Sequence, residues 1–245
     1  LNEIISLLKF ILKKLFDSYL IKRLYFLFTS SFDSDQKQYG RLLEKSNLTY
    51  IEYLYYKLKT ILKKRYLKNY YKKITSKDLS INRPYLYCAL QYQPEKTTCP
   101  QGNSFDDQLK MVTLLSKACP EDWKIYVREH PSQFISAHAR YGERYRSVNY
   151  YNTIKNLPNV KLVPLEYDNF KLIDNARATI SVTGTSGWES LVRGKPSINF
   201  GYSWYRFCKG NFYAKDYDSL KEIIELIQRG YKVKQHNIES FIYTI

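Results

Sequence analysis

A regular alternation of short apolar runs and amphipathic segments begins at residue 83 and narrows the choice of fold more than any other feature. The apolar runs have the length of buried strands and lie at residues 85–90, 123–127, 160–163, 178–182 and 196–200. Segments with apolar residues at helical spacing lie at residues 105–118, 145–156, 168–175, 186–193 and 220–228. Strands that alternate with helices in this way form βαβ units. We therefore predict an α/β domain built on a Rossmann-like, doubly wound parallel sheet.

The first third of the chain has a different character. Residues 1–80 contain one glycine and no proline, and their apolar residues recur at helical spacing. This pattern predicts long helices over residues 3–28 and 47–75, with a loop over residues 29–40. We therefore divide the chain into a helical basic segment over residues 1–80 and a Rossmann-like domain over residues 81–245.

Positive charge is concentrated in that helical segment. The whole chain has a net charge of +16, and residues 1–80 hold 17 Lys and Arg against 7 Asp and Glu. Such a balance favours anionic partners. Residues 3–28 could lie on an acidic membrane surface, and the tyrosines and lysines of residues 47–75 could bind RNA. The alternative for both is an ordinary helix with one packed and one solvated face.

The cysteines and histidines do not have metal-ligand spacing. The four cysteines are scattered without a CxxC pair, and the chain has three histidines. We therefore expect no structural zinc site. Scattered cysteines without a secretory signal indicate a reducing cytoplasm. The chain contains no stretch of 18 uncharged apolar residues, so its sequence does not predict a transmembrane helix.

Polar clusters follow three of the predicted strands, where ligands bind to a parallel sheet. The first is Gln91-Tyr92-Gln93-Pro94-Glu95, which comes after the strand at 85–90. Pro94 stiffens the turn, so that Gln93 and Glu95 can face the crevice. The carboxylate of Glu95 could act as a base or hold sugar or ribose hydroxyls. The alternative is a solvent-facing loop.

The second cluster is Arg128-Glu129-His130-Pro131, after the strand at 123–127. Histidine can donate to a phosphate oxygen and, when protonated, can assist a phosphate leaving group. The planar fork of Arg128 is suited to phosphate. The alternative for His130 is a structural hydrogen bond.

The third cluster follows the strand at 178–182 and begins a helix. It contains Thr183, Gly184, Thr185, Ser186, Gly187 and Glu189. Glycines let a ligand approach the backbone, and a helix N-terminus attracts phosphate. The alternative is a capping segment with Thr185 or Ser186 as the cap. The pattern is neither a Walker A motif nor GxGxxG, so it does not support a P-loop ATPase or a dinucleotide dehydrogenase.

Taken together, these motifs resemble the capsule polysaccharide biosynthesis family, which includes the bacterial β-Kdo transferases. The resemblance spans about residues 83–205 and is carried by four motifs in chain order: Leu90-Gln91-Tyr92-Gln93-Pro94-Glu95, Arg128-Glu129-His130-Pro131, Ser181-Val182-Thr183-Gly184-Thr185-Ser186-Gly187-Trp188-Glu189 and Gly194-Lys195-Pro196. The Gln-Pro-Glu and His-Pro elements are its most specific parts.

The resemblance implies a GT-B glycosyltransferase whose C-terminal domain binds a nucleotide sugar, CMP-Kdo in characterised members. It implies that His130 contacts the CMP phosphate and that Gln93 and Glu95 line the donor pocket, with His130 and Glu95 as the catalytic candidates. Residues 183–187 would cradle the nucleotide, and Glu189 would hold a sugar or ribose hydroxyl. The resemblance also implies that no metal and no cofactor is needed, with the nucleotide sugar as substrate, because positive groups and a helix end can stabilise the departing phosphate. The acceptor would be a lipid-linked or glycan molecule at the cytoplasmic face of the inner membrane.

Residues 1–80 have almost no strand pattern, whereas a complete GT-B enzyme has two sheets. The chain begins at Leu1, and Met111 is its only methionine, so we expect it to be part of a longer protein. On this interpretation it holds the donor domain and lacks most of the acceptor domain. The alternatives are a non-catalytic sugar- or nucleotide-binding remnant, a basic nucleic-acid-binding protein and a sugar-nucleotide epimerase. The donor sugar itself stays open.

Overall fold

The computed structural model describes residues 50–76, 78–95, 98–135 and 145–244. The predicted helix at 3–28 and the predicted loop at 29–40 lie outside the described residues. The chain divides into two compact units, Leu1–Leu58 and Lys59–Ile245. All the described strands belong to the second unit, to which the following paragraphs refer.

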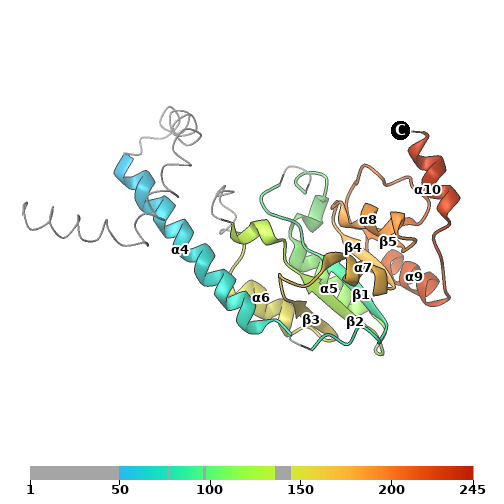
Figure 1. Ribbon diagram of the computed structural model, residues 1–245, viewed down its shortest axis with the longest axis horizontal. Helices are drawn as coiled ribbons and strands as arrows, with labels where there is room; N and C mark the ends of the chain where they lie inside the picture. The colour runs from blue at the N-terminus through green and yellow to red at the C-terminus, as the bar shows by residue number, and fades with distance from the viewer. Residues whose placement is uncertain (1–49, 77, 96–97, 136–144, 245) are drawn as a thin grey trace, which may run out of the picture. The chain divides into compact units, whose positions relative to one another are not determined.

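Six strands form one sheet (Figure 1). They are β1 (Tyr85–Ala89), β2 (Lys124–Arg128), β3 (Val160–Val163), β4 (Ala178–Ser181), β5 (Ser197–Asn199) and β6 (Asn211–Tyr213). The described α-helices are α4 (Tyr50–Ile74), α5 (Gln108–Ala118), α6 (Val148–Lys155), α7 (Asn169–Asn175), α8 (Ser186–Val192), α9 (Tyr217–Gln228) and α10 (Gln235–Ile242). Two 3₁₀ helices, η1 (Asn103–Asp106) and η2 (Pro131–Phe134), follow β1 and β2.

The strand order is β3-β2-β1-β4-β5-β6, and every neighbouring pair is parallel. This is the order of a doubly wound Rossmann sheet, in which the chain starts at the centre and winds outward in both directions. The predicted fold class is therefore confirmed. The direction of winding reverses between β1 and β4, and a ligand crevice is expected beyond their carboxyl ends.

Alternate residues of each strand point to opposite faces of the sheet. Leu86 and Cys88 of β1 belong to a large core cluster that also contains buried residues of α5, α6 and α9. Tyr85 and Tyr87 of the same strand belong to a second cluster, which contains buried residues of α7. Helices therefore cover both faces of the sheet, as Figure 1 shows for α5 and α7 on either side of β1. Central strands buried on both faces explain the continuous apolar runs in the sequence.

The last turns of α4 join the core of the sheet. Leu67 and Tyr71 are 3% and 0% exposed and lie in the same cluster as the inner face of α5. The hydroxyl of Tyr71 donates to the carbonyl of Val163 at the end of β3, with 2.7 Å between the oxygens. The helix predicted over residues 47–75 is present in its described part and is tied to the domain by its C-terminal end.

The sequence pattern predicts neither strand β6 nor helix α10. Strand β6 extends the sheet beyond β5 and has only three residues, none of them buried. Helix α10 packs its one buried residue, Ile238, against a small cluster that includes Leu191 and Tyr205. Neither element carries an apolar run long enough to be recognised in the sequence.

Candidate functional site

Three loops meet at the carboxyl edge of the sheet. Strands β2, β1 and β4 are neighbours, so the segments that follow them lie side by side. These segments are the three polar clusters singled out in the sequence. Between them lies a cavity of about 390 Å³, here called the larger cavity, at the point where the direction of winding reverses.

The larger cavity brings together most of the predicted site residues. Those that line it are Glu95, Arg128, His130, Pro131, Thr183, Gly184, Thr185, Ser186 and Glu189. Gln91, Asn169 and Trp204 also line it. Residues from the loops after β1, β2 and β4 therefore surround one cavity, as expected for neighbouring parallel strands.

His130 is held in one orientation by the loop after β2. Its Nδ1 accepts a hydrogen bond from the backbone N–H of Ser132, with 3.2 Å between the nitrogens, and so caps η2. A neutral ring with Nδ1 as acceptor carries its proton on Nε2. Partial burial lowers the pKa of His130, against the opposing effect of the carboxylates of Glu129 and Glu95. His130 thus offers a neutral N–H donor to a ligand.

Arg128 ends β2 and lines the same cavity. Its Nη2 donates to the carbonyl of Leu165 at 2.8 Å, which fixes the guanidinium group. Its Nε is buried and finds no hydrogen-bond partner among the described residues. A buried, charged donor without a partner is costly unless a ligand or water satisfies it. Arg128 and His130 therefore form the hydrogen-bond donor side of the cavity, with Arg128 supplying its positive charge.

The glycine-rich segment after β4 is joined to the loop after β1. The side-chain amide of Gln91 accepts from the backbone N–H of Thr183 at 2.7 Å and donates to its hydroxyl at 3.1 Å. The carbonyl of Gly184 accepts a hydrogen bond from the hydroxyl of Tyr205. Thr185 occupies the N-cap position of α8 and makes no capping bond with its side chain.

Gly187 does not line the cavity but lies beneath it. A Cβ atom at this position would lie 2.2 Å from the hydroxyl oxygen of Tyr205 and 2.4 Å from that of Ser197. Only glycine fits such a close approach of α8 to the residues below it. The structure thus places Gly187 in the packing of α8 rather than among the residues that face a ligand.

Glu189 faces the larger cavity from the first turn of α8. Its Oε2 accepts a hydrogen bond from the amide of Asn169 at 3.0 Å. The amide oxygen of Asn169 in turn accepts from the hydroxyl of Tyr87 at 2.5 Å. This chain of bonds orients one carboxylate oxygen and leaves acceptor capacity for hydroxyl groups of a ligand.

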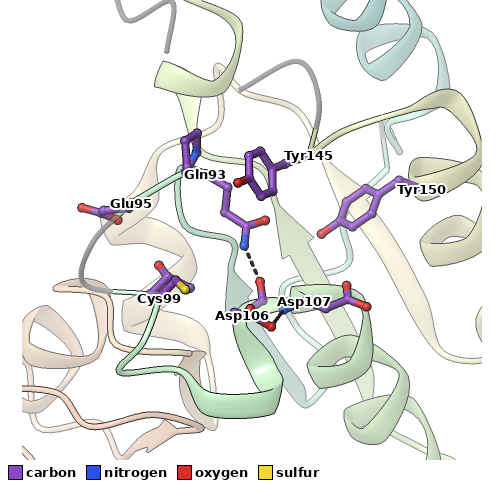
Figure 2. Close-up of a pocket in the computed structure, with 9 residues that line it drawn as sticks. Gln93, Glu95, Cys99, Asp106, Asp107, Tyr145 and Tyr150 are labelled. Carbon is purple, nitrogen blue, oxygen red and sulfur yellow. Dashed lines mark hydrogen bonds between the residues drawn. The ribbon is translucent and has the colours of Figure 1, made fainter. Parts of the chain in front are cut away.

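Gln93 and Pro94 do not reach the larger cavity. They line a second cavity of about 250 Å³, here called the smaller cavity, shown in Figure 2. Glu95 lines both cavities and is exposed. The two spaces therefore adjoin at Glu95.

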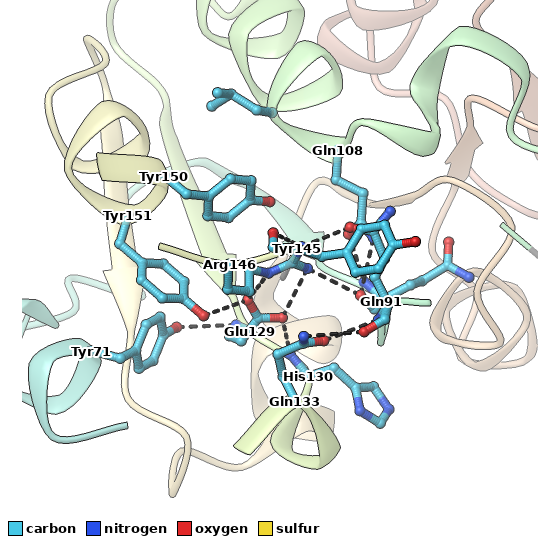
Figure 3. Close-up of polar contacts among 12 residues, drawn as sticks. Tyr71, Gln91, Gln108, Glu129, His130, Gln133, Tyr145, Arg146, Tyr150 and Tyr151 are labelled. Atoms are coloured by element: carbon cyan, nitrogen blue, oxygen red, sulfur yellow. Dashed lines mark hydrogen bonds and ion pairs between the residues drawn. The ribbon is translucent and has the colours of Figure 1, made fainter. Parts of the chain in front are cut away.

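Behind the site lies a buried ion pair that sequence reasoning missed (Figure 3). The carboxylate of Glu129 pairs with Arg146, with 2.5 Å between Oε2 and Nε, and both side chains are at most 1% exposed. Glu129 also accepts from the hydroxyl of Tyr151 at 2.9 Å and from the backbone N–H of His130 at 2.8 Å. Burial alone would lower the pKa of Arg146, but the Glu129 carboxylate outweighs it and raises that pKa, so the guanidinium stays charged. The pair is therefore a charged anchor for the loop that carries His130.

Arg146 also connects this anchor to the loop after β1. Its Nη1 donates to the side-chain oxygen of Gln93 at 2.7 Å, and its Nη2 donates to the carbonyl of Gln91 at 3.2 Å. Two further amides hold the same loop in an extended form. Gln108 exchanges two hydrogen bonds with the backbone of Gln91, and Gln133 exchanges two with the backbone of Gln93. The loop is therefore fixed from three sides.

Two negative findings concern only the described part of the chain. Within it, no group of three or more His, Cys, Asp or Glu side chains is arranged to hold a metal ion. Nor does any helix there have the length and apolar character needed to cross a membrane.

Comparison with known proteins gives one family and a set of distant structures. The family described as "Capsule polysaccharide biosynthesis protein" matches residues 23–210. No curated protein matches the chain.

Two of the solved structures that match are of UDP-GlcNAc 2-epimerase from Methanocaldococcus jannaschii. One shares 14% identity with a TM-score of 0.45, over 74% of this chain and 49% of that one. The other, in complex with UDP-GlcNAc and UDP, shares 16% identity with a TM-score of 0.43, over 76% of this chain and 52% of that one. The chain spans about half the length of these structures.

Proposed function

Since the chain belongs to the capsule polysaccharide biosynthesis protein family, we propose that it binds a nucleotide sugar in the larger cavity and forms the donor-binding half of a GT-B glycosyltransferase. The transferred sugar on this proposal is Kdo, supplied as CMP-Kdo. The acceptor is a lipid-linked or glycan molecule of surface polysaccharide synthesis.

The proposal rests on one observation: the larger cavity is lined both by hydrogen-bond donors that suit a phosphate and by carboxylates that suit hydroxyl groups. Arg128 and His130 supply donors on the β2 side. On the β4 side, more come from the hydroxyl groups of Thr183, Thr185 and Ser186. Glu95 and Glu189 supply carboxylates that can accept from sugar or ribose hydroxyls. A nucleotide sugar presents a phosphate between two hydroxyl-bearing rings, so its charge pattern complements that of the cavity.

The position of each group suggests its part in the transfer. The Nε2–H of His130 and the unpaired Nε–H of Arg128 would donate to the donor phosphate. The acceptor hydroxyl would attack the anomeric carbon and pass its proton to the Glu95 carboxylate. The bond between the anomeric carbon and the phosphate oxygen would break, and CMP would leave with the electron pair. Stabilisation of the leaving phosphate by these donors would lower the barrier without a metal ion.

The remaining parts of the proposal concern what lies beyond the described residues. The chain spans about half the length of the structures it matches, and the activity of a whole enzyme is part of the proposal. We propose that the basic segment at residues 1–28 contacts an anionic membrane surface, where a lipid-linked acceptor would also lie.

Calorimetric titration with CMP tests the proposal, with UMP, GMP and ADP as competing nucleotides. Selective CMP binding is expected, and His130→Ala should weaken it by more than about tenfold, as expected when a charged phosphate loses its donor. His236→Ala is the matched control, since His236 is exposed on α10, away from the larger cavity. Absence of nucleotide binding in a folded sample would contradict the proposal and favour a remnant without donor affinity.

A further inference from the structure

The smaller cavity contains two buried hydroxyl groups that nothing in the described part of the chain satisfies. Thr98 is 1% exposed and lines the cavity, and its Oγ1 has no hydrogen-bond partner. The hydroxyl of Tyr150, which lines the same cavity, is likewise buried without a hydrogen-bond partner. Buried polar groups are nearly always paired, and each unpaired one costs about 1–3 kcal/mol. Two in one small space indicate that something polar fills it.

The charge of the smaller cavity is opposite to that of the phosphate side of the larger one. Its titratable side chains include the carboxylates of Glu95, Asp106 and Asp107, and no Lys, Arg or His is among the described residues that line it. One oxygen of Asp106 accepts from the backbone N–H of Asp107, and one oxygen of Asp107 caps α5 through the N–H of Leu109. The second oxygen of each carboxylate can accept from a ligand. A phosphate or an acidic sugar would be repelled here, whereas hydroxyl groups would be bound.

The shape and lining of the cavity indicate a single ring. Its volume of about 250 Å³ is below the roughly 300–1,000 Å³ of sites for drug-sized ligands. Figure 2 shows the rings of Tyr145 and Tyr150 on one side of the space, with the amide of Gln93 and the carboxylates of Asp106 and Asp107 nearby. Aromatic faces with a few convergent polar groups are the usual lining of a specific ligand site. A sugar ring offers apolar C–H faces and a rim of hydroxyls that match this lining.

We propose that the smaller cavity binds a neutral, hydroxyl-rich sugar ring of the acceptor, next to the nucleotide sugar in the larger cavity. This inference rests on the proposed function, because Glu95 lines both cavities and a hydroxyl of the bound ring would lie toward it. The unpaired hydroxyls of Thr98 and Tyr150 would bond to the ring, and the carboxylates of Asp106 and Asp107 would select against an anionic acceptor sugar.

Cys99 provides a direct readout of occupancy. It lines the smaller cavity and is exposed, whereas the other three cysteines are buried, so a maleimide should label Cys99 first. Methyl β-D-glucopyranoside and methyl β-D-galactopyranoside are the neutral probes. Methyl β-D-glucuronide, which differs from the glucoside by a carboxylate, is the anionic control. We expect a neutral glycoside to slow the labelling of Cys99 and the glucuronide to do so far less.

Two variants test whether the protection of Cys99 arises from binding in the smaller cavity. Thr98→Val and Tyr150→Phe each remove one unpaired hydroxyl with little change of shape, so both proteins should melt at or above the wild-type temperature. Each should weaken protection by the neutral glycoside by about three- to tenfold, the effect of one lost hydrogen bond. The inference would be overturned if no neutral glycoside slowed the labelling of Cys99. It would also be overturned if both variants were protected as well as the wild type, or if the glucuronide protected as well as the neutral glycosides. Titration of the same proteins with CMP reports separately on the larger cavity, so failure of the proposed function can be distinguished.

Discussion

The carboxylate of Glu129 and the guanidinium of Arg146 form an ion pair closed to solvent, with 2.5 Å between Oε2 and Nε. Glu129 directly precedes His130, and Arg146 also contacts the backbone of Gln91. The same pair therefore fixes the two loops that border the larger cavity after β1 and β2. Its loss should affect both the stability of the domain and the shape of the site.

Glu129→Gln should destabilise the domain by about 3–5 kcal/mol, because it leaves the charge of Arg146 buried without a counter-ion. Urea unfolding followed by circular dichroism measures this change. Arg193→Ala is the matched control, since Arg193 forms an ion pair of similar length with Asp174 at the surface. That variant should cost no more than about 1 kcal/mol. An equal change in the free energy of unfolding for the two variants would show that the buried Glu129–Arg146 pair contributes no more than a surface ion pair.

His130→Asn should remove a pH dependence of stability. The folded-state pKa of His130 lies below its ordinary value, which is roughly 6.5 in an unfolded chain. The unfolded chain therefore takes up the proton first as pH falls, and His130 destabilises the fold at acid pH. The asparagine can still accept from the N–H of Ser132 as an N-cap. The stability of wild type relative to the variant should be constant above about pH 7.5 and should decrease as pH falls through about 6.5. A difference that does not vary with pH would argue against a lowered pKa.

Gly187→Ala should destabilise the domain by about 1–3 kcal/mol, the usual effect of overpacking. The added methyl group would lie against the hydroxyls of Tyr205 and Ser197 at distances that no side chain tolerates. Gly184→Ala is the comparison, because the nearest neighbour of its Cβ would be a side-chain atom of Gln91 at 3.3 Å. Thermal unfolding of both variants distinguishes the positions. A Gly187→Ala protein as stable as Gly184→Ala would show that α8 can shift away from Tyr205.

Glu189→Gln should weaken binding of a nucleotide sugar more than binding of the free nucleotide, if its carboxylate holds a sugar hydroxyl. The neutral amide is the poorer acceptor, so a loss of about tenfold is expected. Competition calorimetry with CMP and a CMP-sugar measures the difference. Asp174→Asn, at an exposed position of α7, is the control for a change of charge alone. Equal losses of affinity for both ligands would indicate that Glu189 contacts the nucleotide and not the sugar.

Removal of residues 1–28 should reduce binding to anionic vesicles. This segment contains a run of apolar residues at helical spacing with lysines between them. Sedimentation with phosphatidylglycerol-containing vesicles, at low and at moderate salt, measures the binding. Vesicles of phosphatidylcholine alone are the control for charge. Undiminished binding of the shortened protein would place the membrane contact elsewhere.

Three of the strand ends could be predicted because the apolar runs at 85–90, 123–127 and 178–182 each stop at a polar cluster. The parallel order of β2, β1 and β4 then determines that those clusters meet, which is why Glu95, His130 and Glu189 could be grouped from the sequence alone. Strand β6 could not be found in this way. It lies at the edge of the sheet and has only three residues, so it produces no apolar run.

Arg146 shows the limit of reading charge from sequence. The chain contains 39 Lys and Arg, and nothing local distinguishes the one that is buried against Glu129, 17 positions away. Lys64 is a similar case. It belongs to a positively charged run whose pattern predicts a solvated helix face, yet it is 1% exposed and donates to the carbonyl of Ile135 at 3.1 Å. Both side chains are buried because they pair with groups distant in the sequence, and such pairing produces no periodic pattern in the sequence.

The side chain of Gln91 spans the crevice from the β1 side to the β4 side through its two bonds with Thr183. The separation of the two loops beside the larger cavity is therefore set before any ligand arrives. A ligand that fits this separation loses little affinity to the ordering of the protein, whereas one that is too wide must break two buried hydrogen bonds to enter. Gln91 thus fixes the loop separation that a ligand must match.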